Sequence, residues 1–163
     1  MAELTPVTDD DDLAAIKEVY DHYITTSNAT FHEAPIPIDR LQEFVPVGDP
    51  RHPSFVIRSG GAFAGFCCLS PYKQRSAYDR TAELTVYLRP EFAGRGLGRV
   101  ALERLEAAAV AAGTRVLVGT VCGENEAGLR LMERCGYARC GRLRNVGEKF
   151  GRTLDVVIYQ KEL

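Results

Sequence analysis

The chain has 163 residues, of which 45% are hydrophobic and 26% are charged. This balance is that of an ordinary globular domain, so we expect a single domain over residues 1–163. The formal net charge of −2 argues against a nucleic-acid-binding protein, because such domains are strongly basic. No stretch approaches the ~18 apolar residues of a membrane span, and the first residues lack the regions of a secretory signal. We therefore expect a cytoplasmic protein that binds neither nucleic acid nor membrane.

The five cysteines and three histidines do not indicate a metal site. The odd number of cysteines includes no Cys-x-x-Cys pair, and the histidines show no metal-ligand spacing. We expect free, mostly buried thiols and no bound metal.

The first half of the chain predicts helices followed by short strands. The acidic run Thr8–Asp12 precedes apolar residues at helical spacing up to Thr26, and capping and the helix dipole explain acidic residues at a helix start. Residues 27–37 predict a loop and residues 38–46 a short helix. Three strands are then expected, at Ser54–Arg58, Ala62–Ser70 and Thr81–Leu88.

The second half alternates helices and strands. A long amphipathic helix is expected from Gly96 to Ala112, and the continuous apolar run Arg115–Val121 is typical of a strand covered on both faces. A helix at Glu124–Arg134 and strands at Tyr137–Arg144 and Thr153–Lys161 complete the pattern. The order predicts an α/β fold with a mixed central sheet and helices on both faces.

The strand expected at Thr81–Leu88 has one polar and one apolar face. Thr81, Glu83, Thr85 and Tyr87 alternate with apolar residues. If the strand is central, its polar face needs a partner other than hydrophobic core, which favours a substrate cleft. The alternative is an edge strand with a solvated face.

A glycine-rich segment, Gly94-Arg95-Gly96-Leu97-Gly98-Arg99, stands between this strand and the long helix. Alternate glycines let the backbone approach a ligand, and the free N–H groups and dipole of a helix start attract phosphate. Arg95 and Arg99 would add positive charge beside that phosphate. The segment predicts a pyrophosphate or ribose phosphate site, and the alternative is a flexible turn. A nicotinamide cofactor fits poorly, because no acidic ribose ligand follows at the usual distance.

Two motifs carry a resemblance to a known family. Ala93–Gly98 is similar to the Gln/Arg-x-x-Gly-x-Gly/Ala cofactor motif of the GNAT superfamily of N-acetyltransferases, with Ala93 at the Gln/Arg position. The superfamily's helix-opening Asn, with Gly-Tyr after that helix, is matched by Asn125 and Gly136-Tyr137. Within the superfamily the chain resembles the phosphinothricin acetyltransferase group, although the usual first strand is reduced to a Pro-containing stub. That likeness is carried by Tyr23–Phe31, Lys73–Glu83, Thr85–Tyr87 and Leu143–Gly151 with Asp155.

The resemblance implies a single-domain GNAT-like fold and transfer of an acetyl group from acetyl-CoA to a primary amine. The implied acceptor is small and amino-acid-like, such as phosphinothricin or methionine sulfoximine, and the implied assembly is a homodimer paired through C-terminal strands. The implied cofactor-binding residues are Thr85, Val86, Tyr87, Leu88, Ala93, Gly94, Arg95, Gly96, Leu97, Gly98, Arg99 and Asn125.

Glu83 is the candidate catalytic base for this reaction. An ammonium near pKa 10 must lose a proton before it can attack a thioester. Glu83 lies mid-strand on the polar face, where burial would raise its pKa toward a useful value. The alternative is a structural ion pair with Arg80 or Lys73.

A general acid is less evident, because Met132 stands where the phosphinothricin group has His and Met cannot donate a proton. A CoA thiolate, with a thiol pKa of about 8.5, is a tolerable leaving group without one. Tyr137 could protonate it, but burial of that ring in the core is the stronger expectation.

Four residues are candidates for binding the acceptor. Lys73, Arg75 and Tyr78 could hold its anionic end, and Phe31 could form a wall of the pocket; Lys73 and Arg75 could instead be solvated charges. Two other functions remain open: a protein or peptide N-acetyltransferase, and a non-catalytic acyl-CoA-binding module, which Ala93 and Met132 make plausible.

Overall fold

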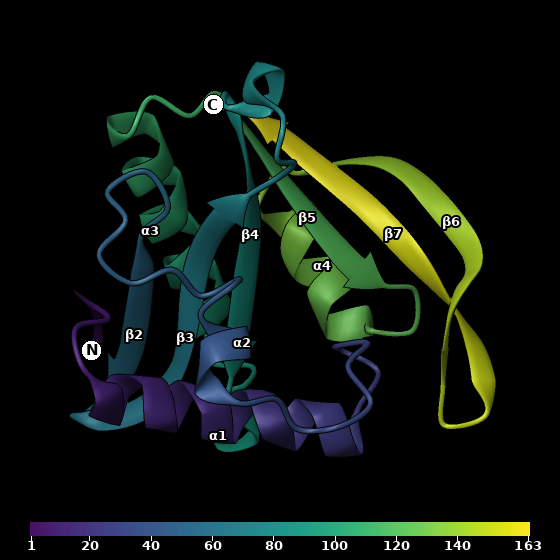
Figure 1. Ribbon diagram of the computed structural model, residues 1–163, viewed down its shortest axis with the longest axis horizontal. Helices are drawn as coiled ribbons and strands as arrows, with labels where there is room; N and C mark the ends of the chain where they lie inside the picture. The colour runs from purple at the N-terminus through teal and green to yellow at the C-terminus, as the bar shows by residue number, and fades with distance from the viewer.

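The computed structural model describes all residues from 1 to 163 and shows one mixed seven-stranded sheet with helices on both faces (Figure 1). The strand order is β1-β2-β3-β4-β5-β7-β6. The predicted α/β class is confirmed. The strands are β1 Ala2–Pro6, β2 Ser54–Ser59, β3 Ala62–Pro71, β4 Thr81–Leu88, β5 Val116–Cys122, β6 Ala138–Lys149 and β7 Arg152–Glu162. The helices are α1 Asp10–Thr26, α2 Ile38–Leu41, α3 Leu97–Ala111 and α4 Glu126–Arg134, with 3-10 turns at Ser76–Tyr78 and Pro90–Phe92.

Each face of the sheet has its own hydrophobic core, because each helix buries one apolar side. Residues of α1 and α2, such as Ile16 and Leu41, pack with Phe66 of β3 on one face. On the other face Leu102 and Leu105 of α3 pack with Leu117 of β5. No helix is both long and apolar enough to cross a membrane.

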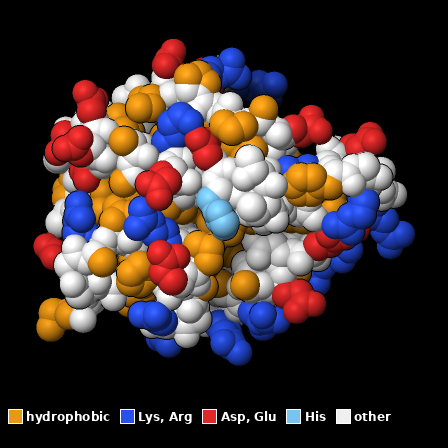
Figure 2. Space-filling view, turned by 90° about the horizontal axis from the view of Figure 1, so that it is seen from below, with side chains coloured by type: hydrophobic (Ala, Val, Ile, Leu, Met, Phe, Trp, Pro, Cys, Tyr) orange, Lys and Arg blue, Asp and Glu red, His pale blue; other side chains and the backbone are white.

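Charged side chains of both signs are interspersed on the face seen in Figure 2, with apolar side chains between them. The acidic run at the start of α1 acts as expected: the Asp9 carboxylate accepts a hydrogen bond from the backbone N–H of Asp12 at 2.8 Å. This caps the helix, and its dipole favours the acidic residues of the first turn.

All five cysteines are free thiols, and Cys67, Cys68 and Cys122 are buried, as predicted.

The pairing of β4 positions the site. β4 is the fourth of seven strands, so the edge-strand alternative is wrong. It pairs antiparallel with β3 along Ala82–Leu88, but it pairs with β5 only over Thr81–Glu83. Beyond Glu83 the two strands diverge (Figure 1), which leaves one side of the β4 backbone without a strand partner.

Three sequence expectations are corrected. β1 is not a stub: all five of its residues pair with β2, and Pro6 is tolerated because β1 is an edge strand. The helix expected at 38–46 is a single turn, Ile38–Leu41, followed by hydrogen-bonded turns over residues 42–44. β6 does not end at Arg144 but continues to Lys149. Its register with β7 shifts at two places, one of them around Asn145, which has a φ of +53°. These shifts interrupt the regular alternation of the strand without ending it.

Candidate active site

A cavity of about 220 Å³ lies where β4 and β5 separate. It is lined on one side by residues of β4 and on the other by β5 and α4, with aromatic residues of the α1–α2 region closing it. Of the residues predicted for the site, five line this cavity: Glu83, Thr85, Val86, Tyr87 and Asn125.

Glu83 lies in the cavity at the point where the strands part. Its Oε1 accepts a hydrogen bond from Thr120 Oγ1 on β5 at 3.1 Å. Burial raises the pKa of the Glu83 carboxyl, while the Thr120 hydrogen bond and the charge of Lys73 oppose that shift. The alternative ion pair with Arg80 or Lys73 is absent, so the carboxylate is free to accept a proton.

The β4 backbone offers hydrogen-bond donors along the same opening. The N–H of Arg89 donates to Ala64 of β3 at 2.8 Å. Because backbone groups alternate in direction along an antiparallel ladder, those of Val86 and Leu88 point to the opposite side, toward the opening. The hydroxyl of Tyr23 donates to the Leu88 carbonyl at 2.6 Å from that side. The N–H groups of Val86 and Leu88 can therefore serve a ligand lying between the strands.

The glycine-rich segment forms the loop before α3, at the far end of β4. Gly94 and Gly96 have φ angles of +74° and +82°, which favour glycine. Gly96 is the N-cap residue of α3, and no side chain caps this helix, whereas Asp9 caps α1 and Asn125 caps α4. The first-turn N–H groups of α3 are thus available to an anion.

The side chains around this loop leave its backbone accessible. Arg95 lies over the ring of Phe92 at 5.3 Å, and Arg99 pairs with Glu103 at 2.8 Å on the surface. Leu97 is buried in the core, so only its backbone can reach a ligand. Ala93 is exposed and has no polar side chain.

Asn125 joins the cavity to the start of α4. Its Oδ1 accepts a hydrogen bond from the Gly128 N–H at 3.0 Å, which caps the helix and fixes the side chain. Its amide N–H groups have no partner within the protein and lie at the cavity wall. They can donate to a ligand, as the predicted role requires.

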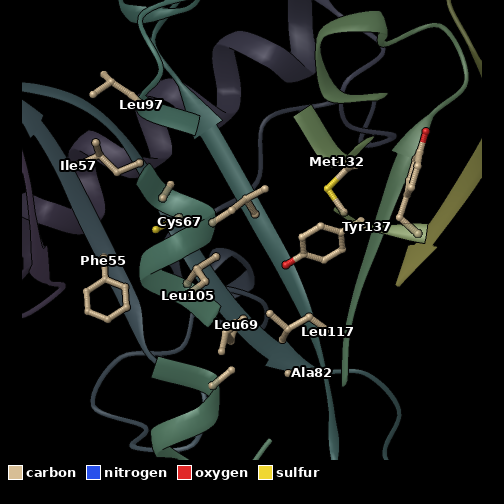
Figure 3. Close-up of a cluster of buried hydrophobic side chains, with 14 of the residues drawn as sticks. Phe55, Ile57, Cys67, Leu69, Ala82, Leu97, Leu105, Leu117, Met132 and Tyr137 are labelled. Atoms are coloured by element: carbon tan, nitrogen blue, oxygen red, sulfur yellow. The ribbon is translucent and has the colours of Figure 1, made fainter. Parts of the chain in front are cut away.

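Met132 and Tyr137 lie in different environments. Met132 lines the cavity, and its methyl group lies over Gly119 of β5. The Tyr137 hydroxyl is buried without a hydrogen-bond partner and points into the hydrophobic cluster (Figure 3). Burial raises the pKa of Tyr137 far above its usual range. The expected burial of the Tyr137 ring in the core is confirmed, so Tyr137 does not take the place of the missing acid.

None of the four residues predicted to bind the acceptor lines the cavity. Lys73, Arg75 and Tyr78 are exposed on the segment between β3 and β4, and only Lys73 has its charge close enough to shift the pKa of Glu83. Phe31 is 37% exposed and rests on Gly147 of β6.

The cavity also contains residues that the sequence did not mark as functional. Tyr20 of α1, Ala29 and Phe44 close it from the α1–α2 side. Tyr20 was identifiable only as part of a helical apolar stripe, and Thr120 only as part of an apolar strand. No sequence signal distinguished them, because they reach the site through tertiary packing.

Comparison with known proteins settles the family. Residues 16–137 match the Acetyltransferase (GNAT) family. The chain belongs to this family. It is an acetyl-CoA-dependent N-acetyltransferase, and the resemblance drawn from its motifs is confirmed.

Relatives within the GNAT family include enzymes with small substrates. A phosphinothricin N-acetyltransferase of Alcaligenes faecalis is 36% identical over 96% of this chain and 81% of the relative. An L-methionine sulfoximine/L-methionine sulfone acetyltransferase of Salmonella typhimurium is 31% identical over 93% of this chain and 90% of the relative. The solved structure of a GNAT phosphinothricin acetyltransferase of Sinorhizobium meliloti in complex with acetyl-CoA is 28% identical, with a TM-score of 0.90 over 99% of this chain and 88% of that one.

Proposed function

We propose that this acetyltransferase moves the acetyl group of acetyl-CoA to the primary amine of a small amino-acid-like molecule such as phosphinothricin or methionine sulfoximine. The observation that carries the proposal is Glu83, a partly buried carboxylate in the cavity beside the free backbone of β4. The names of the relatives support the substrate class.

Acetyl-CoA would lie along the divergence of β4 and β5. The Gly94–Gly98 loop and the first turn of α3 would hold its pyrophosphate, with Arg95 and Arg99 nearby. The backbone of Val86 and Leu88 would pair with the pantetheine arm, which Asn125 would also contact. This arrangement would place the thioester carbonyl near Glu83, where a β4 N–H group can donate to the oxygen as it gains negative charge.

Glu83 would accept the first proton from the substrate ammonium. Its raised pKa makes it a stronger base than an ordinary glutamate. The neutral amine then attacks the carbonyl carbon, the C–N bond forms and the C–S bond breaks. The nitrogen loses its second proton as the amide forms, and the CoA sulfur, as thiolate, can accept it. No step requires a metal ion or a proton from Met132.

Met132→Ala should leave kcat within a few-fold of the wild-type value, because this side chain takes no part in the proton transfers. It should lower stability by about 2–5 kcal/mol, since Met132 is 3% exposed and its removal leaves a cavity. CoA release and thermal melting measure the two effects. A loss of kcat beyond tenfold, at a temperature where the variant is folded, would give Met132 a catalytic role.

The position of Lys73 favours an acceptor that carries an anionic group as well as the amine. No Lys or Arg lines the cavity. The charge of Lys73, however, opposes the rise in the pKa of Glu83, so Lys73 lies near that carboxyl. We propose that Lys73, with Arg75 and Tyr78, binds the carboxylate or phosphinate at the rim, and that Phe31 borders the acceptor on the opposite side.

We also propose a cytoplasmic homodimer that binds no nucleic acid. Leu143, Val146 and Phe150 lie exposed on and beside β6, one of the two edge strands of the sheet, and a second copy could cover them. The near-balanced charge supports the lack of nucleic-acid binding.

Release of free CoA tests the proposed substrate class. The panel contains phosphinothricin, methionine sulfoximine, methionine sulfone, common amino acids, polyamines and peptides with free N-termini. We expect turnover with the first three and little with peptides or polyamines. Preference for peptides would instead indicate a protein N-acetyltransferase, and tight acetyl-CoA binding without CoA release for any amine would indicate a binding module.

A further inference from the structure

Lys149, near the end of β6, is a buried cation without a carboxylate partner. The residue is 2% exposed. Its ammonium forms no ion pair, although the charge of Glu33 acts on it from beyond ion-pair distance. Instead, Nζ donates hydrogen bonds to the backbone carbonyls of Ser27 at 2.7 Å and Thr30 at 2.8 Å. The ring of Phe150 lies 5.1 Å from it. A buried ammonium is costly unless it is well solvated by acceptors, so this arrangement points to a specific role.

The two carbonyls belong to the segment Ser27–Phe31, which follows α1 and turns beneath α4 (Figure 1). Ala29, between them, lines the cavity. Its carbonyl accepts a hydrogen bond from the hydroxyl of Tyr87 on β4 at 2.9 Å. Three carbonyls of this short segment therefore accept side-chain donors, two from Lys149 and one from the strand that carries Glu83.

Further contacts attach the same segment to β6, β7 and the loop after β5. The ring of Phe31 packs on Gly147, where an added Cβ would lie 2.6 Å from Phe31 Cε2. The side chain of Asn28 donates to Glu124 Oε2 at 3.0 Å, and Arg152 of β7 binds both Glu124 oxygens. The wall of the cavity is thus held by the β6–β7 hairpin, whose residues do not line the cavity themselves.

We propose that Lys149 is a positioning residue for the acetyl acceptor: by binding the Ser27 and Thr30 carbonyls it holds Ser27–Phe31 as the acceptor-side wall of the cavity. The role in catalysis rests on the proposed function, because it assumes that the amine binds against this wall. Acetyl-CoA is expected on the other side of the site, so its binding should not depend on Lys149.

Lys149→Met tests this role, because Met retains the length of the side chain but donates no hydrogen bond. The half-buried carbonyl of Ser27 and the buried carbonyl of Thr30 lose their donor. We expect the resulting displacement of the wall to raise KM for the amine roughly tenfold or more. KM for acetyl-CoA should stay within about twofold. Gly147→Ala is a second variant that pushes on Phe31 from the same hairpin while keeping the ammonium, and it should raise the amine KM as well.

Lys161→Met is the matched control. Lys161 also donates to a backbone carbonyl, that of Cys135 at 3.0 Å, and it pairs with Glu106, away from the cavity. This control should melt at a lower temperature while keeping the amine KM of the wild type. An equal rise in amine KM in Lys161→Met, or an equal rise in both substrates' KM in Lys149→Met, would overturn the proposal.

Hydrogen exchange separates this proposal from the question of the substrate. The N–H groups of Ala29 and of His32, the residue after the segment, donate to side chains of the segment, Ser27 Oγ and Thr30 Oγ1. In the absence of any amine, they should exchange at least several-fold faster in Lys149→Met than in the wild type, and at the wild-type rate in Lys161→Met. Unchanged exchange in Lys149→Met would overturn the positioning role, even if the enzyme acetylates the expected amines.

Discussion

Replacement of Glu83 by Gln should lower kcat by roughly 10²- to 10⁴-fold, the usual contribution of a positioned general base. The amide has nearly the shape of the carboxylate and can still accept the Thr120 hydrogen bond at the same place. It cannot take a proton from an ammonium. The loss should therefore appear in kcat for the amine while the cavity keeps its geometry, as measured by CoA release at saturating concentrations of both substrates.

Two measurements on Glu83→Gln distinguish a lost base from a damaged fold. The dissociation constant for acetyl-CoA should match that of the wild type. The melting temperature at neutral pH should be equal or higher, because burial raises the pKa of Glu83 and so disfavours its ionised form in the folded state. Near-normal turnover in this variant would show that another group removes the proton.

Gly65→Ala should cause a large loss of stability. Gly65 of β3 lies opposite Leu88, and an added Cβ would lie 2.2 Å from the Tyr87 carbonyl oxygen and 2.8 Å from Leu88 Cα. Both are backbone atoms that cannot rotate away, so β4 must shift. We expect destabilisation of about 3 kcal/mol or more, which corresponds to roughly 6–12 °C in melting temperature for a chain of this size.

The shift should also weaken acetyl-CoA binding, since the displaced end of β4 carries the Val86 and Leu88 backbone groups. Gly141→Ala provides the control, because a Cβ at that position in β6 would meet no atom within 4 Å. Its stability should stay within about 0.5 kcal/mol of the wild type. A melting temperature of Gly65→Ala within 2 °C of the control would contradict the close approach of β3 to β4.

The local pattern of apolar and polar residues predicted most of the helices and strands. The stripe of α3, the apolar run of β5 and the alternation of β4 are properties of contiguous residues, and each element forms where it was expected. The errors arise where tertiary pairing overrides the local pattern. β1 forms despite Pro6 because β2 supplies a partner strand, and β6 continues past Asn145 because β7 pairs with it on both sides of the irregularity.

In the candidate site, too, features of a single segment could be predicted, whereas contacts between distant segments could not. The positions of Glu83 on β4 and of the Gly94–Gly98 loop before α3 could be predicted, because each follows from the pattern of a single segment. Thr120, which hydrogen-bonds to Glu83, lies 37 positions away on another strand. Lys149 lies 119 positions from Thr30, whose carbonyl it binds. Contacts of this kind depend on how the sheet is ordered, which no single segment of the sequence encodes.

The pH dependence of kcat/KM tests the role of Glu83 most directly. The base works only when ionised, so activity should fall as the pH drops through its pKa. Because burial raises that pKa, the acid limb of the wild type should have its midpoint above the ordinary glutamate value. The small residual activity of Glu83→Gln should lack this limb. A limb with the same midpoint in both proteins would contradict the assignment of Glu83 as the base.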